Sequence, residues 1–321
     1  MSSQKPVLVS GIKPTGQLHI GNYFGAMRQL VELSKAGKYR PFIFVADYHA
    51  LNTMQDAQEM KLRTQELVKA YLAIGLDPKD VVFFKQSDVP AHTELCWIFD
   101  TITTMPYLMR SHAYKDAEAK NKEINVGTFN YPMLMAADIL LYDAAVVPVG
   151  ADQKQHIEYA RDAAEKFNRT FKTDVFKLPE PYIMPEVAVV PGTDGQKMSK
   201  SYGNVIPLFA SRDELVKCVM SIITDSSGER PENVYRIHRL VRSEAELASL
   251  YAEHRGNYKS LKEALVEDLD RYLAPMRVAY EELEKDTGIV EEVLTKGKRE
   301  ARAVSEVKME QVRRAIGVAE R

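Results

Sequence analysis

Apolar runs alternate with helical patterns through the first half of the chain. Short runs rich in valine, isoleucine and phenylalanine predict strands at 7–9, 42–45, 81–84 and 146–149. Between these runs, apolar residues recur at the spacing of one helix face, first from Tyr23 to Val31 and then from Leu62 to Ile74. Strand–helix–strand order with continuous apolar strands predicts a parallel sheet that is covered by helices on both faces.

The pattern changes after Pro207. Serine and glutamate stand three residues apart, as in a capping box, before three helical apolar patterns: Ser211 with Glu214, Ser243 with Glu246, and Ser260 with Glu263. No strand pattern follows Pro207. The sequence therefore predicts an α/β domain over residues 1–207 and an all-α domain over residues 208–321.

Composition restricts the class of protein. The 321 residues are 45% hydrophobic and 27% charged, an ordinary globular balance in a chain long enough for two domains. The net charge of -2 argues against DNA as a partner, although a local basic patch would still allow contact with a folded RNA. Cys96 and Cys218 form no CxxC pair, which excludes a zinc or iron–sulfur site built from cysteine alone.

The same features indicate a compartment. Two unpatterned cysteines suit a reducing cytoplasm. The first residues show no signal-peptide pattern, and no apolar run approaches the length of a membrane helix. We therefore expect a cytosolic protein with no membrane partner.

A glycine-containing motif, Pro-Thr-Gly-Gln-Leu-His-Ile-Gly-Asn, occupies residues 14–22 between the first strand and the first helix. Glycine lets the backbone approach a ligand, and a helix N-terminus offers free N–H groups to phosphate. His19 can donate to phosphate oxygens, and Asn22 adds an amide. By itself, the motif fits equally well a strand-to-helix turn whose only role is packing.

A second motif, Lys-Met-Ser-Lys-Ser, occupies residues 197–201 after a turn-rich segment at 191–195. Two lysines that flank small hydroxyl residues suit a triphosphate, because lysine is a mobile point charge that can follow a leaving phosphate. A solvated lysine-rich turn is the alternative for this motif alone.

Together the His-Ile-Gly-Asn element and the Lys-Met-Ser-Lys-Ser loop are the two signatures of class I aminoacyl-tRNA synthetases, which the chain resembles over essentially its whole length. The resemblance implies a Rossmann-like catalytic domain followed by a helical anticodon-binding domain. It also implies ATP and Mg²⁺ as cofactors, a tRNA partner and a homodimer. Lys296, Lys298, Arg299 and Arg302 are basic residues that would contact the anticodon stem or form a solvated helix face.

An apolar helical segment at 131–142 carries one carboxylate, Asp138. A carboxylate among apolar residues is costly unless it is paired, and the indole N–H of tryptophan would pair it. Periodicity alone allows a solvent-facing aspartate equally. If Asp138 is buried and unpaired without substrate, its removal leaves stability unchanged or raises it.

The segments at 131–142 and 147–158 resemble the tryptophan-specific branch of the family, which implies L-tryptophan as substrate and tRNA(Trp) as partner. Three alternatives remain: tyrosine activation, a small nucleotidyltransferase, and a synthetase-like protein that binds tRNA or a partner without ligating. The long helical second half argues against the nucleotidyltransferase.

The resemblance implies roles for single residues. Tryptophan would be bound by His49, Tyr131, Met135, Asp138, Val147, Val149 and Gln153. ATP would be bound by Lys13, Pro14, Thr15, Gly21, Asn22, Gly150, Ala151, Asp152, Val189, Val190, Lys197, Met198, Ser199, Lys200 and Ser201. Catalytic contacts to the phosphates would come from His19, Lys115, Lys197 and Lys200, although Lys115 also suits a solvated loop. No protein metal ligand is expected, because phosphates would hold Mg²⁺.

Four residues at three places depart from the family's pattern. Lys13 stands where glutamine is common, and Val9 where phenylalanine is common. Tyr202 and Gly203 precede Asn204 where Asp-Pro is usual. Lys13 adds a charge beside the substrate amino acid or the α-phosphate.

Overall fold

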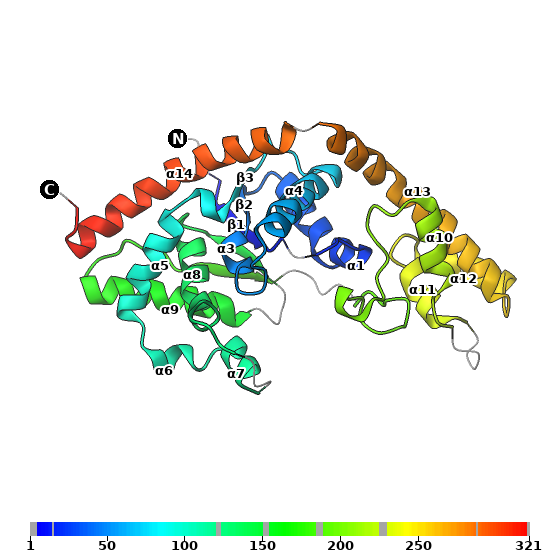
Figure 1. The fold of residues 1–321 in the computed structure, drawn as a ribbon, viewed down its shortest axis with the longest axis horizontal. Helices are drawn as coiled ribbons and strands as arrows, with labels where there is room; N and C mark the ends of the chain where they lie inside the picture. Colours follow the sequence, from blue (N-terminus) through cyan, green and yellow to red (C-terminus); the bar gives the residue numbers. More distant parts are fainter. Residues whose placement is uncertain are drawn as a thin grey trace.

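The computed structural model in Figure 1 describes most of the chain. It covers residues 5–14, 16–119, 123–149, 154–183, 189–224, 230–286 and 288–319.

A five-stranded parallel sheet forms the centre of the first half, as the sequence predicts. Its strands are β1 (Val7–Ile12), β2 (Arg40–Val45), β3 (Val82–Lys85), β4 (Val146–Val149) and β5 (Glu180–Ile183), in the order β3-β2-β1-β4-β5. The four expected strands are confirmed. The sequence does not predict β5. Among the described strands its Glu-Pro-Tyr-Ile sequence pairs with β4 alone, and an edge strand needs no continuous apolar run and tolerates proline.

Helices cover both faces of this sheet. They include α2 (Arg28–Lys35), α3 (Asp47–Ala50), α4 (Ala57–Ala73), α5 (Ala91–Ile102), α6 (Met105–Leu108), α7 (His112–Ala119), α8 (Val126–Leu140) and α9 (Lys154–Phe171), with a 3-10 turn η2 at Gln86–Asp88. Neighbouring residues of β2 enter different cores: Ile43 lies in the cluster with α4, and Phe44 in the cluster with α5 and α8. This alternation explains why the strand is apolar throughout.

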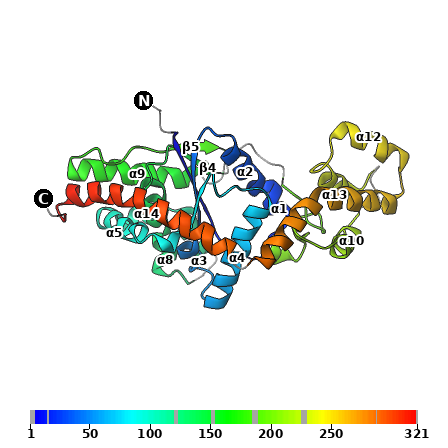
Figure 2. The same cartoon turned by 90° about the horizontal axis from the view of Figure 1, so that it is seen from above.

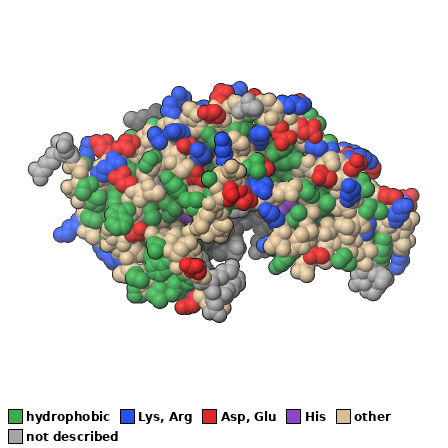
Figure 3. Space-filling view, in the orientation of Figure 1, with side chains coloured by type: hydrophobic (Ala, Val, Ile, Leu, Met, Phe, Trp, Pro, Cys, Tyr) green, Lys and Arg blue, Asp and Glu red, His purple; other side chains and the backbone are tan. Residues whose placement is uncertain are grey.

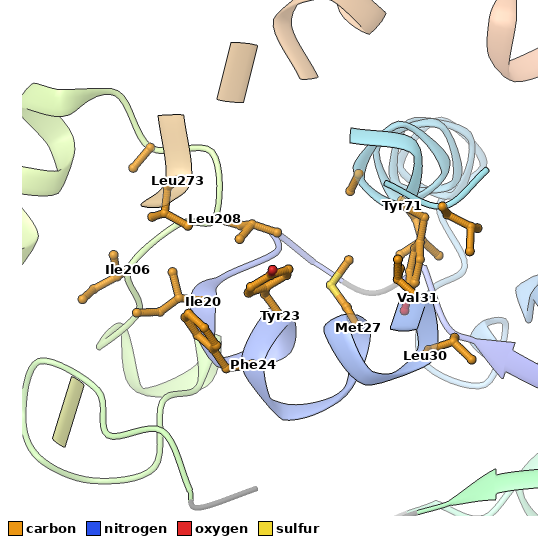
Figure 4. Packing of buried hydrophobic residues seen from close by; sticks show 14 of the residues in the cluster. Ile20, Tyr23, Phe24, Met27, Leu30, Val31, Tyr71, Ile206, Leu208 and Leu273 are labelled. Atoms are coloured by element: carbon orange, nitrogen blue, oxygen red, sulfur yellow. The ribbon is translucent and has the colours of Figure 1, made fainter. Parts of the chain in front are cut away.

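The first core joins the two halves of the chain. A short helix α1 (Ile20–Asn22) continues into a π-helical turn η1 (Tyr23–Met27). Figure 4 shows Ile20, Tyr23 and Phe24 beside Ile206, Leu208 and Leu273 from the second half, all members of one buried cluster. The motif at 14–22 therefore begins a helix that packs against both halves.

The second half is helical among the residues that the structure describes. It contains the 3-10 turn η4 (Lys200–Tyr202), then α10 (Arg212–Met220), α11 (Glu232–His238), α12 (Glu244–Glu253), α13 (Tyr258–Lys285) and α14 (Ile289–Ile316). Reciprocal capping boxes at Ser211 and Ser243 are confirmed. The third expected cap, Ser260, is wrong. Asn257 caps α13 and accepts the N–H of Ser260 at 3.2 Å, so the helix begins earlier.

The last helix returns to the sheet. In Figure 1, α13 and α14 form an arch over the molecule, and α14 packs against β3. A Cβ added to Gly297 would overlap the carbonyl oxygen of Phe83. Although α13 and α14 are each 28 residues long, no helix of the described ranges has the uncharged apolar length needed to cross a membrane.

In this position of α14, basic residues that the sequence allows either to contact the anticodon stem or to form a solvated helix face contact the first half of the chain. Lys296 Nζ donates to the carbonyl of Pro78 at 2.8 Å, and Arg302 Nε to that of Asp88 at 2.6 Å. Lys298 lies 3.9 Å from the Asp88 carboxylate. These three side chains hold α14 on the first half of the chain, and their contact with the anticodon stem stays a prediction. The domain boundary at 208 stays a prediction.

Candidate active site

His19 begins α1 and is fixed by a reciprocal pair of hydrogen bonds with Asn22. The Asn22 N–H donates to His19 Nδ1 at 3.3 Å, and the His19 N–H donates to Asn22 Oδ1 at 3.1 Å. Burial lowers the pKa of His19, so the ring is neutral at pH 7. Since Nδ1 accepts, the proton is on Nε2, which remains as a donor for a ligand oxygen.

The Lys-Met-Ser-Lys-Ser motif forms a hairpin that is held by backbone bonds. Pro191 and Lys197 form an antiparallel bridge, and the Met198 N–H donates to the carbonyl of Val190 at 2.9 Å. Ser199 and Ser201 place their hydroxyl oxygens 2.9 Å apart. The main chain thus fixes where the two lysines leave the loop.

Buried Asn204 organises this hairpin from inside. Its Oδ1 accepts the N–H of Ser199 at 2.8 Å, and its Nδ2 donates to Asp194 Oδ1 at 2.6 Å and to the carbonyl of Lys197 at 3.2 Å. In the sequence, Asn204 stands out only as the end of the tripeptide that departs from the family's pattern. Its three partners lie five to ten residues away in the sequence, so no local pattern predicts this role.

The two motifs lie against each other. Gly16 has a φ of 73°, and a Cβ there would lie 2.9 Å from Lys200 Cδ, so the lysine side chain crosses the turn. The segment after the hairpin is bonded to the first motif, because the Ile20 N–H donates to Ile206 and the Leu208 N–H donates to Leu18, both at 3.0 Å. One surface therefore carries Lys200, the turn and the N-terminus of α1.

Lys115 lies elsewhere. It is exposed on α7, which Figure 1 shows well apart from α1. The structure brings Lys200 to the first motif but leaves Lys115 at a distance, so a catalytic role for Lys115 stays a prediction.

A cavity of about 230 Å³ opens at the carboxyl ends of β1, β2 and β4. Its walls include the described residues that were expected to bind tryptophan: His49, Tyr131, Met135, Asp138, Val147 and Val149. Lys13 also lines it, and desolvation lowers the pKa of this lysine. The expected positions Thr15, Gly150, Ala151, Asp152 and Gln153 lie outside the described residues.

Asp138 is buried in the cavity wall and accepts three hydrogen bonds. His92 Nδ1 and Gln86 Nε2 lie 2.6 Å and 2.7 Å from Oδ1, and His49 Nε2 lies 2.8 Å from Oδ2. Burial acts to raise the pKa of Asp138, but the bonds from the two histidines outweigh it and lower the pKa to about 2. The group is therefore an ionised acceptor at neutral pH.

The partners of Asp138 are themselves oriented. The Gln86 Oε1 accepts the N–H of His49 at 3.4 Å, which directs its amide nitrogen to the carboxylate. His92 Nε2 lies 2.9 Å from the hydroxyl of Tyr142. A neutral His92 that donates to Asp138 from Nδ1 accepts from Tyr142 at Nε2. Asp138 is thus paired without substrate. The expectation that its removal leaves stability unchanged or raises it applied only to an unpaired carboxylate, so it does not hold here.

Gln86, His92 and Tyr142 were missed by the sequence analysis. Gln86 directly follows β3, as His49 closely follows β2, and polar residues after adjacent parallel strands meet at one edge of the sheet. The position of Gln86 closely after a predicted strand could therefore have identified it as a site residue. A histidine in the apolar helix α5 gave none, because its partner is far along the chain.

The segment at Val189 and Val190 reaches the hairpin. Val190 is buried beside Met198, whereas Val189 is exposed and its carbonyl accepts from Arg236 Nη2 at 3.1 Å. This strip forms a backbone edge next to the lysine hairpin, where the adenine was expected.

Comparisons with known proteins agree with this geometry. The family model described as tRNA synthetases class I (W and Y) matches residues 1–290. The tryptophan–tRNA ligase of Fusobacterium nucleatum is 45% identical over 97% of this chain and 97% of the relative. That of Rhodopirellula baltica is 42% identical over 97% of this chain and 99% of the relative.

Solved structures give the same result. The tryptophanyl-tRNA synthetase of Campylobacter jejuni, complexed with ADP and tryptophan, aligns with a TM-score of 0.89 and 41% identity, covering 97% of this chain and 99% of that one. The chain therefore belongs to the class I tRNA synthetases for tryptophan and tyrosine, among the bacterial tryptophan–tRNA ligases.

Proposed function

We propose that this protein activates L-tryptophan with ATP, giving tryptophanyl-adenylate and pyrophosphate, and then transfers the tryptophanyl group to the 3′ end of tRNA(Trp). The observation that carries the proposal is the joining of the two motifs, with Lys200 over the turn at Gly16. The Asp138 cavity opens at the end of β1 from which that turn leaves. The bound ADP and tryptophan of the Campylobacter jejuni relative support the same pair of substrates.

In the first step, the tryptophan carboxylate attacks the α-phosphorus of ATP, an O–P bond forms, and the bond to pyrophosphate breaks. A carboxylate is already nucleophilic at neutral pH, so this step needs no general base. Lys197, Lys200 and the Nε2–H of His19 act on the phosphate charge, and positioning supplies the remaining rate. Mg²⁺ would accompany ATP, bound mainly by the phosphates, and would neutralise part of their charge.

Asp138 is the proposed reader of the indole. Among the described contacts, Oδ2 accepts one hydrogen bond, from His49, so it has a further lone pair for the indole N–H. The low pKa keeps the carboxylate ionised, and its three protein partners fix its direction. Phenylalanine offers no N–H to this acceptor and is therefore disfavoured.

The second step requires tRNA. We assign anticodon contact to the helical segment that begins at residue 208, with α10 to α13 supplying the surface, because α14 is held against β3. The terminal adenosine hydroxyl attacks the acyl carbon, and AMP leaves. The cytosol is the proposed place of action.

A second copy of the chain is part of the proposal. Trp97 on α5 and Met105 on α6 are 70% and 66% exposed, values that are unusual for large apolar side chains. Figure 3 shows hydrophobic side chains gathered over the end of the molecule that carries α6. A homodimer that buries this surface explains the exposure.

ATP–pyrophosphate exchange with each of the twenty amino acids tests the function. We expect exchange with tryptophan and background with the others. Exchange driven by tyrosine, or by no amino acid, contradicts the proposal. Charging of tRNA(Trp) with labelled tryptophan then separates a ligase from a protein that binds tRNA without ligating.

A further inference from the structure

The helix α11 reaches the hairpin of the proposed ATP site through two side chains. Arg236 Nη2 donates to the carbonyl of Val189 at 3.1 Å. Asn233 Nδ2 donates to the carbonyl of Ile223 at 3.0 Å, and the same side chain fills the space beside Gly195, where a Cβ would lie 2.6 Å from Nδ2. Two residues one turn apart on α11 thus contact Val189, which precedes the hairpin, and Gly195, which lies in its turn.

The Ile223 contact continues into the hairpin. The Ile223 N–H donates to the carbonyl of Thr193 at 2.7 Å, and the Thr193 N–H donates to the carbonyl of Asn204 at 3.0 Å. Asn204 is the buried residue that holds Ser199 and Lys197. A continuous set of hydrogen bonds therefore connects α11 to the lysine motif.

The bond from Arg236 has a geometric consequence for the next peptide group. A trans peptide is planar, so the carbonyl of Val189 and the N–H of Val190 point in opposite directions. Holding that carbonyl on the α11 side directs the Val190 N–H away from α11. The carbonyl of Val190 is fixed separately by the Met198 N–H. Both sides of Val190, the expected adenine edge, are therefore oriented by named contacts.

The position of α11 is set by the rest of the helical segment. His238 is fully buried, with Nε2 2.8 Å from Asp268 on α13 and Nδ1 3.3 Å from the Tyr251 hydroxyl on α12. Val234 and Ile237 enter the core that contains Leu269 of α13. A change in the position of α13 therefore carries α11, and Arg236 with it.

We infer that Arg236 is a positioning residue for ATP, through which the helical segment sets the orientation of the adenine-binding peptide. The inference rests on the proposed function. Arg236 belongs to the helical segment that would meet the anticodon, and it contacts the Val189–Val190 edge. Under this inference, the helical segment therefore affects the affinity for ATP.

The test is ATP–pyrophosphate exchange by the full chain, with KM measured separately for ATP and tryptophan. Arg236→Ala should raise the ATP KM by about two- to tenfold, the range expected from one hydrogen bond, and leave the tryptophan KM unchanged. Arg236→Lys should restore part of the ATP affinity. Arg239→Ala is the matched control, because Arg239 is exposed at the C-terminus of the same helix and pairs with Glu244.

If the wild type is active and the Arg236→Ala protein has unchanged KM values, the inference is wrong. A parallel rise of both KM values with a lower melting temperature also overturns it, since that result indicates a structural role only. A wild type without tryptophan-dependent exchange overturns the proposed function itself, and the inference with it.

Discussion

His92 and Asp138 are joined by a buried hydrogen bond of 2.6 Å between Nδ1 and Oδ1. The bond connects α5 to α8 inside the second core, beneath the wall of the proposed tryptophan cavity. The carboxylate holds helices together, and under the proposed function it would also present an acceptor to the substrate. The same residue links stability to specificity.

Replacing Asp138 with alanine should lower both stability and activity. The change leaves the side-chain donors of His49, Gln86 and His92 without their acceptor in a buried place, which costs about 3–5 kcal/mol of unfolding free energy. Tryptophan-dependent exchange should be lost. Chemical denaturation and exchange check this, with Asp80→Ala, an exposed aspartate, as the control. A variant with wild-type stability contradicts the network described here.

The same carboxylate should make stability depend on pH in the acid range. Its pKa in the folded protein is about 2, below the ordinary value of 3.8, so the unfolded chain binds more protons between these values. Stability from Asp138 is therefore full above about pH 4 and is lost as the pH falls toward 2, a contribution of about 2–3 kcal/mol. Urea unfolding of wild type and Asp138→Asn between pH 5 and pH 2 measures it. Equal pH slopes would exclude this role.

Lys200→Ala should slow adenylate formation more than it weakens tryptophan binding. The phosphate gains charge as pyrophosphate leaves, so a lysine beside the first motif acts mainly in the transition state. We expect a barrier increase of about 2–4 kcal/mol. Single-turnover kinetics measure this, with Lys61→Ala on the exposed side of α4 as the control. An unchanged single-turnover rate removes Lys200 from catalysis.

Gly297→Ala should destabilise the fold. The added methyl group overlaps the carbonyl of Phe83 and forces α14 away from β3, which costs about 1–3 kcal/mol or more. Gly25→Ala is a matched control, because a Cβ at Gly25 meets nothing within 4 Å. Thermal unfolding of both variants measures the difference. Equal melting temperatures would show that α14 does not pack on β3 as described.

The sequence predicted features that depend on local pattern. The continuous apolar run of β2 required burial on both faces, and the structure places its residues in two separate cores. The glycine at position 16 and the lysine at position 200 belong to motifs that the sequence predicts to bind phosphate. Their contact was not visible in either motif, because it depends on the bonds from Ile20 and Leu208 across the chain.

Features that depend on distant partners were missed or misjudged. The strand β5 lacks an apolar run, as an edge strand can, because within the described ranges β4 is its one paired neighbour. The cations of α14 have the charge pattern of a solvated helix, yet Lys296 and Arg302 donate to carbonyls of the first half. Asp138 had an identifiable environment of apolar neighbours, but its three donors come from residues far from it in the sequence.

The most direct test of the central claim removes the donor from the substrate and leaves the protein intact. Benzothienylalanine has sulfur in place of the indole N–H and nearly the same shape as tryptophan. Since the partners of Asp138 remain, the loss is that of one hydrogen bond to a charged acceptor, about 1.5–3 kcal/mol. We predict that kcat/KM for ATP–pyrophosphate exchange falls by about tenfold to a hundredfold relative to tryptophan. Equal kcat/KM values for the two amino acids would contradict the assignment of Asp138 as the reader of the indole.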